Sequence, residues 1–135
     1  MANKRVYLGL DVGGKRIGVA VGDSIARIAQ PLATVEVGQN EAGQLHTYMK
    51  DLDVTDVVIG RPRNQSGDTT GQTREVERFV VSTLEGEGCE LHWQDESVTS
   101  VIAEERLKAR KKPYSKHDID AEAAAIILQD YLETL

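Results

Sequence analysis

The chain has 135 residues, of which 40% are hydrophobic and 28% charged, and its formal net charge is −6 at pH 7. This length predicts one compact domain at residues 1–135 and excludes a two-lobed enzyme, and the composition excludes an intrinsically disordered chain. The negative charge argues against a generic nucleic-acid binder, because phosphate binding depends on Lys and Arg. Six of the sixteen basic residues nevertheless fall within 106–116, a segment that also fits a solvated helix end.

The sequence carries no signal for a membrane or secreted protein. Its longest apolar run spans six residues, 123–128, whereas a helix needs about 20 to cross a bilayer. The N-terminus reaches Asp11 too soon for a signal-peptide core. The single cysteine, Cys89, cannot form an internal disulfide, and with three scattered histidines it gives no zinc-ligand spacing. These features predict a cytoplasmic protein.

The first part of the chain favours strands. Alternating apolar and polar residues predict three of them, at 6–12, 17–22 and 31–37. The tight turn Gly13–Arg16 joins the first two, which should therefore form an antiparallel hairpin. Apolar residues at helical spacing then indicate a helix over 41–52, and a short buried strand follows at 56–60.

The second part alternates helices with a strand. From 61 to 73 the only apolar residue is Pro62, which indicates a mobile loop entering a helix that Gly86 and Gly88 stop. A fifth strand follows at 90–95. Two further helices, at about 99–111 and 118–132, are separated by Pro113. The order of elements predicts an α/β fold, with one mixed sheet and helices on both faces.

Three acidic residues are candidates for catalysis. Asp11 lies near the end of an apolar strand, where an unpartnered carboxylate is costly, although it also fits a turn residue that bonds to the following glycine amides. Glu96 follows Asp95 at the exit of the fifth strand, which is either a ligand-binding edge or an ordinary polar strand end. Asp120 lies in the first turn of the last helix, where the helix dipole alone stabilises a carboxylate.

Small residues predict that Asp120 meets Asp11. Ala123 and Ala124 follow Asp120 on one helix face, and the first hairpin offers a similarly small surface at Gly9, Gly18, Ala20 and Gly22. Clustered carboxylates repel, by about 3 kcal/mol for two unit charges 5 Å apart at an effective dielectric of 20. Such a cluster therefore requires a cation. All-oxygen ligands favour Mg²⁺ or Mn²⁺, which support the hydrolysis of phosphodiesters.

Two phosphate-binding motifs are less consistent with the sequence. Residues 9–15 fit the spacing G-x-x-x-x-G-K of a P-loop, but Arg16 replaces the magnesium-binding Ser or Thr, and a strand follows in place of a helix. Asp11 and Gly13 also resemble the first phosphate loop of the actin and sugar-kinase ATPases. Those enzymes bind nucleotide between two lobes, whereas this chain has the length of one.

Four blocks together resemble the YqgF family, also called RuvX, of RNase H-like proteins. The blocks are LGLDVGGKRIGVAVGD at 8–23, VVIGRPRNQSGDTTG at 57–71, DESVTSVIAEERL at 95–107 and DIDAEAAAIILQDYLE at 118–133. The family is described as Holliday junction resolvase-like and as nucleases of pre-16S rRNA. The resemblance implies a five-stranded mixed sheet whose first three strands are antiparallel. It also implies that Asp11, Glu96 and Asp120 are the catalytic, metal-binding acids.

The resemblance further implies a hydrolase that uses Mg²⁺ or Mn²⁺ to cleave structured nucleic acid, in particular the 5′ end of pre-16S rRNA. Two alternatives stand beside it: a dimeric resolvase of branched DNA, and a non-catalytic RNA-binding module of ribosome assembly. Two features depart from the family, Ser97 in place of an Arg and the short connection ARKKPYSKH at 109–117.

Basic residues near the strand ends are predicted to bind substrate phosphates, although each also fits a solvent-facing loop charge. They are Lys15, Arg16, Arg61 and Arg63. The sequence favours neither a monomer nor a dimer.

Overall fold

A computed structural model describes residues 4–62, 71–96 and 99–135 of the chain, without the side chains of 62, 71–73, 96, 99 and 100. Its elements in chain order are β1 (Val6–Val12), β2 (Arg16–Asp23), β3 (Gln30–Glu36), α1 (Glu41–Asp51), β4 (Asp56–Pro62), α2 (Gly71–Phe79), the π-helical turn η1 (Val80–Leu84), β5 (Glu90–Glu96), α3 (Thr99–Ala109) and α4 (Lys116–Leu132).

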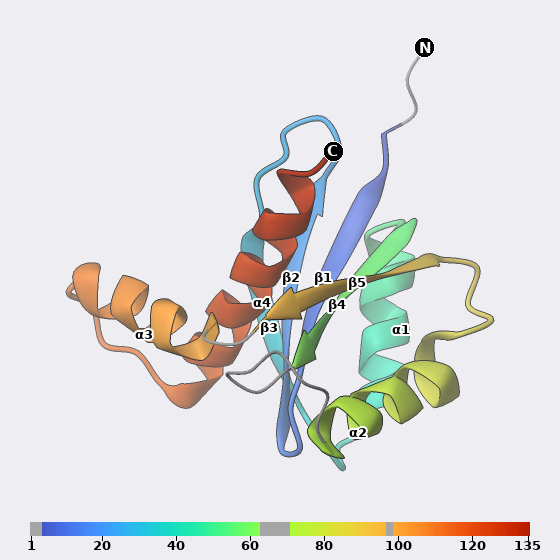
Figure 1. Ribbon diagram of the computed structural model, residues 1–135, viewed down its shortest axis with the longest axis horizontal. Coiled ribbons are helices and arrows are strands. Elements are labelled where there is room, and N and C mark those ends of the chain that lie inside the picture. Colours follow the sequence, from blue (N-terminus) through green and yellow to red (C-terminus); the bar gives the residue numbers. More distant parts are fainter. Residues whose placement is uncertain (1–3, 63–70, 97–98) are drawn as a thin grey trace.

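The five strands form one mixed sheet in the order β3-β2-β1-β4-β5 (Figure 1). β2 pairs antiparallel with both β1 and β3, while β4 is parallel to β1 and to β5. The predicted hairpin and the predicted mixed sheet with three antiparallel strands are confirmed. β5 is an edge strand two places from β1, so residues at their ends are separated by the width of β4.

Helices cover both faces of the sheet, as predicted (Figure 1). Successive strand side chains point to opposite faces. One face packs on α1, α2 and η1 through a core that includes Leu8, Leu10, Val57, Ile59, Leu45, Val76 and Leu84. The other face packs on α4 through Tyr7, Ala20, Val58, Ala124, Ile127 and Leu128. α3 forms an outer layer that contacts α4 at Ala103, Ala123 and Ile126.

Glycines allow α4 to lie unusually close to the first hairpin. A Cβ added to Gly9 would lie 2.7 Å from the Cβ of Leu128, and one added to Gly18 would lie 1.9 Å from the carbonyl oxygen of Asp120. Neither position therefore accepts a larger residue without movement of the helix. The predicted close contact between small residues of the last helix and the hairpin is confirmed.

The boundaries of several helices differ from the prediction; α3, for example, ends at Ala109 and not at about 111. α4 begins at Lys116, two residues early, because Ser115 is the N-cap and its backbone N–H donates to Asp118 Oδ2 at 2.8 Å. The predicted loop at 61–73 is wrong at both ends, because β4 extends to Pro62 and α2 begins at Gly71, and residues 63–70 lie outside the described part of the chain. The helix predicted after it consists of α2 followed by a π-helical turn. Among the helices of residues 4–62, 71–96 and 99–135, none combines the length and apolarity that a bilayer crossing needs.

Candidate functional site

Asp11 and Asp120 come together at one end of the sheet. Asp11 is the penultimate residue of β1, is partly buried and pairs across the hairpin with Gly18. Because Gly18 has no side chain, the backbone of Asp120 lies directly on it. Paired Cα atoms of antiparallel strands are about 5 Å apart, so the Asp120 carbonyl oxygen lies within roughly 9 Å of the Asp11 Cα. The structure thus places two of the three predicted acids side by side.

The Arg16 side chain binds Asp120 at the same end of the sheet. It begins β2, two residues before Gly18 and on the same face of the sheet, and its Nε donates to Asp120 Oδ2 at 2.5 Å. Both side chains are partly exposed, at 25% and 22%. The hydrogen bond to the Asp120 carboxylate, together with its negative charge, raises the pKa of Arg16. This predicted phosphate-binding residue is therefore the counter-ion of a predicted catalytic acid.

Glu96 is the last residue of β5 and pairs with Pro62 of β4. The strand pairings align Leu10 with Ile59 and Ile59 with Trp93, so Glu96 lies two residues beyond the level of Asp11. Across the sheet their backbones are separated by two strand spacings, about 9.6 Å. The side chain of Glu96 lies outside the described part of the chain, and so do Arg63 and Ser97.

The remaining predicted basic residues lie in different places. Lys15 is exposed in the turn that follows Asp11, at the end of the sheet where the acids meet. The guanidinium carbon of Arg61 instead lies 4.5 Å from the ring centroid of Trp93, and Trp93 packs on the core beneath α1 and α2. The Arg61 side chain is thus on the opposite face from Asp120. Its Nε is buried and has no hydrogen-bond partner in the part of the chain that the structure describes.

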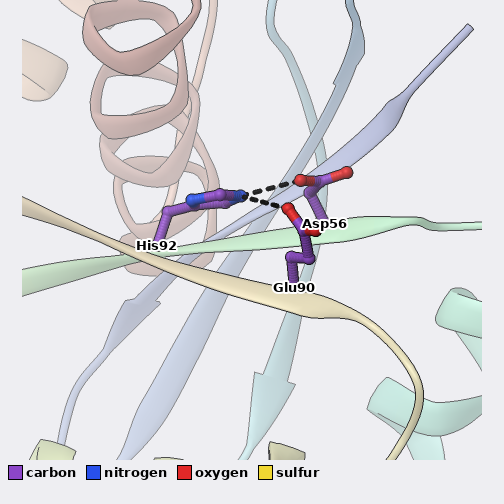
Figure 2. A group of neighbouring side chains, drawn as sticks. All are labelled: Asp56, Glu90 and His92. Carbon is purple, nitrogen blue, oxygen red and sulfur yellow. Dashed lines mark hydrogen bonds and ion pairs between the residues drawn. The ribbon is translucent and has the colours of Figure 1, made fainter.

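A second group of acidic and imidazole side chains lies at the other end of the parallel strands, where β4 and β5 begin (Figure 2). One ligand atom from each of Asp56, Glu90 and His92 lies within 4.8 Å of the others. His92 Nε2 is 2.7 Å from Asp56 Oδ2 and 4.0 Å from Glu90 Oε2. None of these three residues was predicted from the sequence to have a role. The available signal was an Asp at the start of an otherwise apolar strand.

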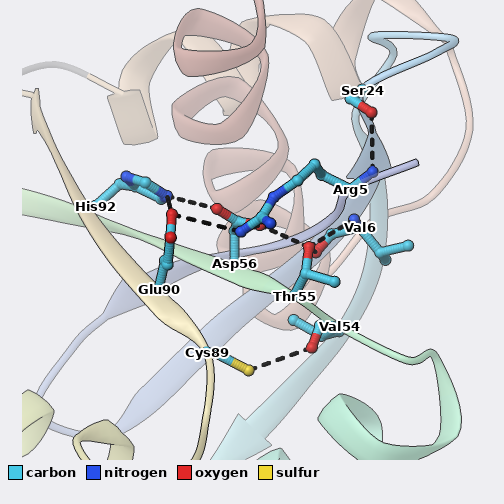
Figure 3. A network of polar contacts seen from close by, with 9 residues as sticks. All are labelled: Arg5, Val6, Ser24, Val54, Thr55, Asp56, Cys89, Glu90 and His92. Atoms are coloured by element: carbon cyan, nitrogen blue, oxygen red, sulfur yellow. Dashed lines mark hydrogen bonds and ion pairs between the residues drawn. The ribbon is translucent and has the colours of Figure 1, made fainter. Parts of the chain in front are cut away.

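Arg5 and Thr55 both bind the Asp56 carboxylate of this second group (Figure 3). Arg5 Nε and Nη2 each lie 2.8 Å from Asp56 Oδ1, and the Thr55 hydroxyl donates to the same oxygen at 2.6 Å. The Asp56 side chain is only 2% exposed, and its charge raises the pKa of Arg5. Arg5 and Thr55 occupy Oδ1 of this buried carboxylate and His92 occupies Oδ2, so neither oxygen is open to a divalent cation. We assign the group as an ion-pair network around the buried Asp56 carboxylate, which joins the starts of β1, β4 and β5.

Comparison of the sequence with known proteins identifies relatives along nearly the whole chain. Residues 5–134 match the family described as "RuvX: Holliday junction resolvase". A protein of Chloroflexus aurantiacus is 39% identical over 135 residues, covering 97% of this chain and 88% of the relative. A protein of Synechocystis sp. is 37% identical over 137 residues, covering 98% and 90%. Both relatives are named as candidate pre-16S rRNA nucleases.

Several solved structures share this architecture, among them a Holliday junction complex and a Holliday junction resolvase. RuvC of T. thermophilus in complex with a Holliday junction substrate superposes with a TM-score of 0.57 at 17% identity, covering 96% of this chain and 94% of that one. The fowlpox virus Holliday junction resolvase gives a TM-score of 0.56 at 12% identity, covering 96% and 99%. At such identities the likeness establishes the fold, which is RNase H-like, as the sequence resemblance implies.

Proposed function

Because this chain belongs to the RuvX family, we propose that it is a metal-dependent endonuclease, a hydrolase of phosphodiester bonds in structured nucleic acid. The observation that supports this most directly is the packing of α4 on Gly18, which puts Asp120 beside Asp11. The names of the relatives favour precursor 16S rRNA as the substrate. The reaction then belongs to ribosome biogenesis and takes place in the cytoplasm.

The residues at this end of the sheet fit a divalent cation. Asp11 and Asp120 offer carboxylate oxygens, the donors that Mg²⁺ and Mn²⁺ prefer, and Gly18 keeps a side chain from separating them. We propose Asp11, Glu96 and Asp120 as the metal-binding, catalytic residues. A divalent ion held there would supply Lewis-acid stabilisation of charge on the phosphate and a more acidic bound water.

The basic residues receive different roles in this proposal. Arg16 holds the Asp120 carboxylate in place through its Nε. Lys15, exposed beside Asp11, and Arg63 bind substrate phosphates. Arg61, stacked on Trp93, fixes the end of β4 on the opposite face of the sheet and acts on substrate only through that position.

The replacement Asp11→Asn tests the proposal. It removes one negative charge and keeps the shape of the side chain, so cleavage of an RNA spanning the 5′ end of precursor 16S rRNA should fall by at least two orders of magnitude, as for loss of a group that stabilises a transition state. The circular dichroism spectrum should not change. Asp51→Asn, which neutralises an exposed carboxylate on α1, is the matched control. An Asp11→Asn protein that cleaves like the control would refute the assignment.

A four-way DNA junction should be assayed beside the RNA, because the family description names a Holliday junction resolvase. A resolvase cuts symmetrically as a two-fold dimer. Junction cleavage by a protein that sediments as a dimer would favour that substrate, whereas RNA cleavage by a monomer favours the proposed one. Binding of RNA without any EDTA-sensitive cleavage would instead identify a non-catalytic assembly module.

A further inference from the structure

The connection between α3 and α4 concentrates the positive charge of the protein. Residues 106–116 contain six of the sixteen basic residues and none of the 22 acidic ones, so the rest of the chain has ten basic and 22 acidic residues, a formal charge of −12. The overall charge of −6 therefore conceals a segment of charge +6. Segregation of this kind creates a local field that attracts phosphate even in an acidic protein.

The two arginines of this segment serve the fold. Glu122 of α4 is a buried carboxylate, 2% exposed, and Arg110 binds it with two contacts, Nη2 to Oε1 at 2.8 Å and Nη1 to Oε2 at 3.3 Å. Arg106 Nη1 lies 4.0 Å from the same Oε1. A buried carboxylate needs such compensation, and the paired geometry fastens α3 to α4. Both arginines are thus ion-paired with Glu122, unlike the lysines of the segment.

The four lysines of the segment point outward. We call Lys108, Lys111, Lys112 and Lys116 the lysine strip. All four are exposed, and within the described residues none has an acidic group within 4.0 Å. Two nearby carboxylates accept hydrogen bonds at the connection between α3 and α4. Glu104 accepts one from the Tyr114 hydroxyl, and Asp118 accepts one from the Ser115 backbone N–H. Within the described residues, the four ammonium groups are therefore not held in ion pairs.

The backbone conformation at Lys111 indicates that the charge of the strip has a function. Lys111 has φ of +57°, the left-handed region, and its N–H closes the end of α3 on the Lys108 carbonyl at 3.1 Å. Glycine is the usual residue at such a helix end, and another L-residue there costs about 1 kcal/mol. A lysine thus occupies a position at which glycine would be more stable, with its ammonium group in solvent.

The strip leads to the candidate site. The connection runs from the outer end of α3 back to the first turn of α4 (Figure 1). Lys116 is the first residue of α4, and Asp120 follows four residues later, about 6 Å along the helix axis. A polynucleotide whose reacting phosphate lies at Asp11 and Asp120 would therefore continue along the strip.

We propose that the lysine strip binds the phosphate backbone of a double-helical arm adjacent to the bond that is cleaved. This inference rests on the proposed function. Lysines act on phosphate as point charges and do not read bases, so the contact is independent of sequence. Single strands are instead bound by exposed aromatic side chains. Tyr114, in the connection between α3 and α4, is half-buried and hydrogen-bonded to Glu104, so it is not exposed for stacking. A duplex arm is common to a folded rRNA precursor and a branched DNA.

A pair of double variants tests the strip. Lys111→Gly with Lys112→Gln removes two strip charges, and the glycine also relieves the left-handed backbone, so lost stability would not explain lost binding. Lys4→Gln with Lys50→Gln removes two exposed lysines elsewhere and is the matched control. Dissociation constants should be measured in EDTA, over a series of salt concentrations, for a hairpin from precursor 16S rRNA, a four-way DNA junction and a single strand of equal length.

The strip variant should bind duplex more weakly and lose about 0.9 of the log–log salt slope for each phosphate contact removed, about 2 in total. The control should keep the slope of the wild type, and single-strand affinity should change little. At saturating substrate and Mg²⁺ the strip variant should cleave at the normal rate with a raised KM. The substrate that shows the larger loss, RNA or junction, identifies the natural duplex.

Equal affinities and salt slopes for the strip variant and the control would overturn the inference, and so would a loss confined to the single strand. Either result leaves the proposed nuclease intact if Asp11→Asn still abolishes cleavage. Conversely, wild-type protein that binds duplex through the strip but cleaves nothing would refute the nuclease and retain the strip as a duplex-binding surface.

Discussion

Each of three carboxylates in this protein is compensated by an arginine. Asp56 is bound by Arg5, Glu122 by Arg110 and Asp120 by Arg16. Asp56 and Glu122 are almost fully buried, and an unpaired charge in such a place costs several kcal/mol. Asp120 differs because its carboxylate remains 22% exposed. Of the three, it is the one that solvent, or a substrate with its cation, can reach.

Asp23 provides a pH-dependent prediction at the residue scale. Its Oδ1 accepts the backbone N–H groups of Ala26 and Ile25, at 2.8 and 2.9 Å, and these hydrogen bonds lower the pKa of the carboxyl. A lowered pKa in the folded state means that the stabilisation is complete above the unfolded pKa of about 3.9 and is lost as the pH falls through the folded pKa. Asp23→Asn should therefore unfold at lower urea concentration than wild type between pH 5 and 8.

The difference between the two proteins should shrink steadily below about pH 4, because protonation removes the charge that Asn lacks. Asp51→Asn is a suitable control, since it neutralises an exposed carboxylate whose backbone is helical. A difference between wild type and Asp23→Asn that stays constant down to pH 2 would show that the charge of Asp23 contributes nothing.

At the scale of elements, Gly18 determines where α4 lies. A Cβ there would be 1.9 Å from the carbonyl oxygen of Asp120, and backbone cannot yield as a flexible side chain does. Gly18→Ala should therefore push the first turn of α4 away from β2, at a cost of about 3 kcal/mol for overpacking. For a chain of this length that cost lowers the melting temperature by roughly 10 °C.

Gly14→Ala is the matched control, because an added Cβ at Gly14 meets no atom within 4 Å. Its melting temperature should stay within about 2 °C of wild type. Cleavage should fall in Gly18→Ala beyond what the loss of folded protein explains, because Asp120 moves away from Asp11. Equal melting temperatures for the two alanine variants would contradict the close packing of α4.

Periodicity of the sequence was enough to predict the strands, the hairpin and the layers of helices. Small residues at Gly9, Gly18 and Ala124 were also enough to predict the approach of α4 to β1, because close packing leaves a compositional trace. Pairings between distant side chains leave no such trace. Arg16 with Asp120 and Arg61 with Trp93 depend on strand order and on rotamers, so sequence patterns placed Arg16, Arg61 and Asp120 near strand or helix ends without their partners.

The candidate site was likewise predictable from the sequence only in part. Asp11 and Asp120 were linked by the small surface between them, whereas Glu96 belongs to the edge strand, beyond β4. Its distance from Asp11 is a property of strand order, which alternation alone does not determine. The Asp56 network was missed for a related reason, because its arginine lies 51 residues away, just before another strand.

At the scale of the whole molecule, the site should couple divalent ions to global stability. Asp11 of β1 and Asp120 of α4 come close only in the folded chain, and the proposed site adds Glu96 of β5. An ion that binds this site favours folding by RT ln(1 + [L]/Kd), about 1.4 kcal/mol at a concentration ten times Kd. For this length that corresponds to a rise of roughly 5 °C in melting temperature. We expect such a rise with 10 mM Mn²⁺ or Mg²⁺.

Screening of the net charge of −6 would also raise the melting temperature, so the comparison must separate the two effects. Sodium chloride at matched ionic strength measures screening alone, and Asp11→Asn measures the response without one ligand while changing the net charge by only one unit. The proposed site requires a larger shift with the divalent salt than with sodium chloride, and a smaller divalent shift in Asp11→Asn than in wild type. Equal shifts in all cases would mean that the ions act only by screening the surface charge. The close approach of the Asp11 and Asp120 carboxylates would then need an explanation other than metal binding.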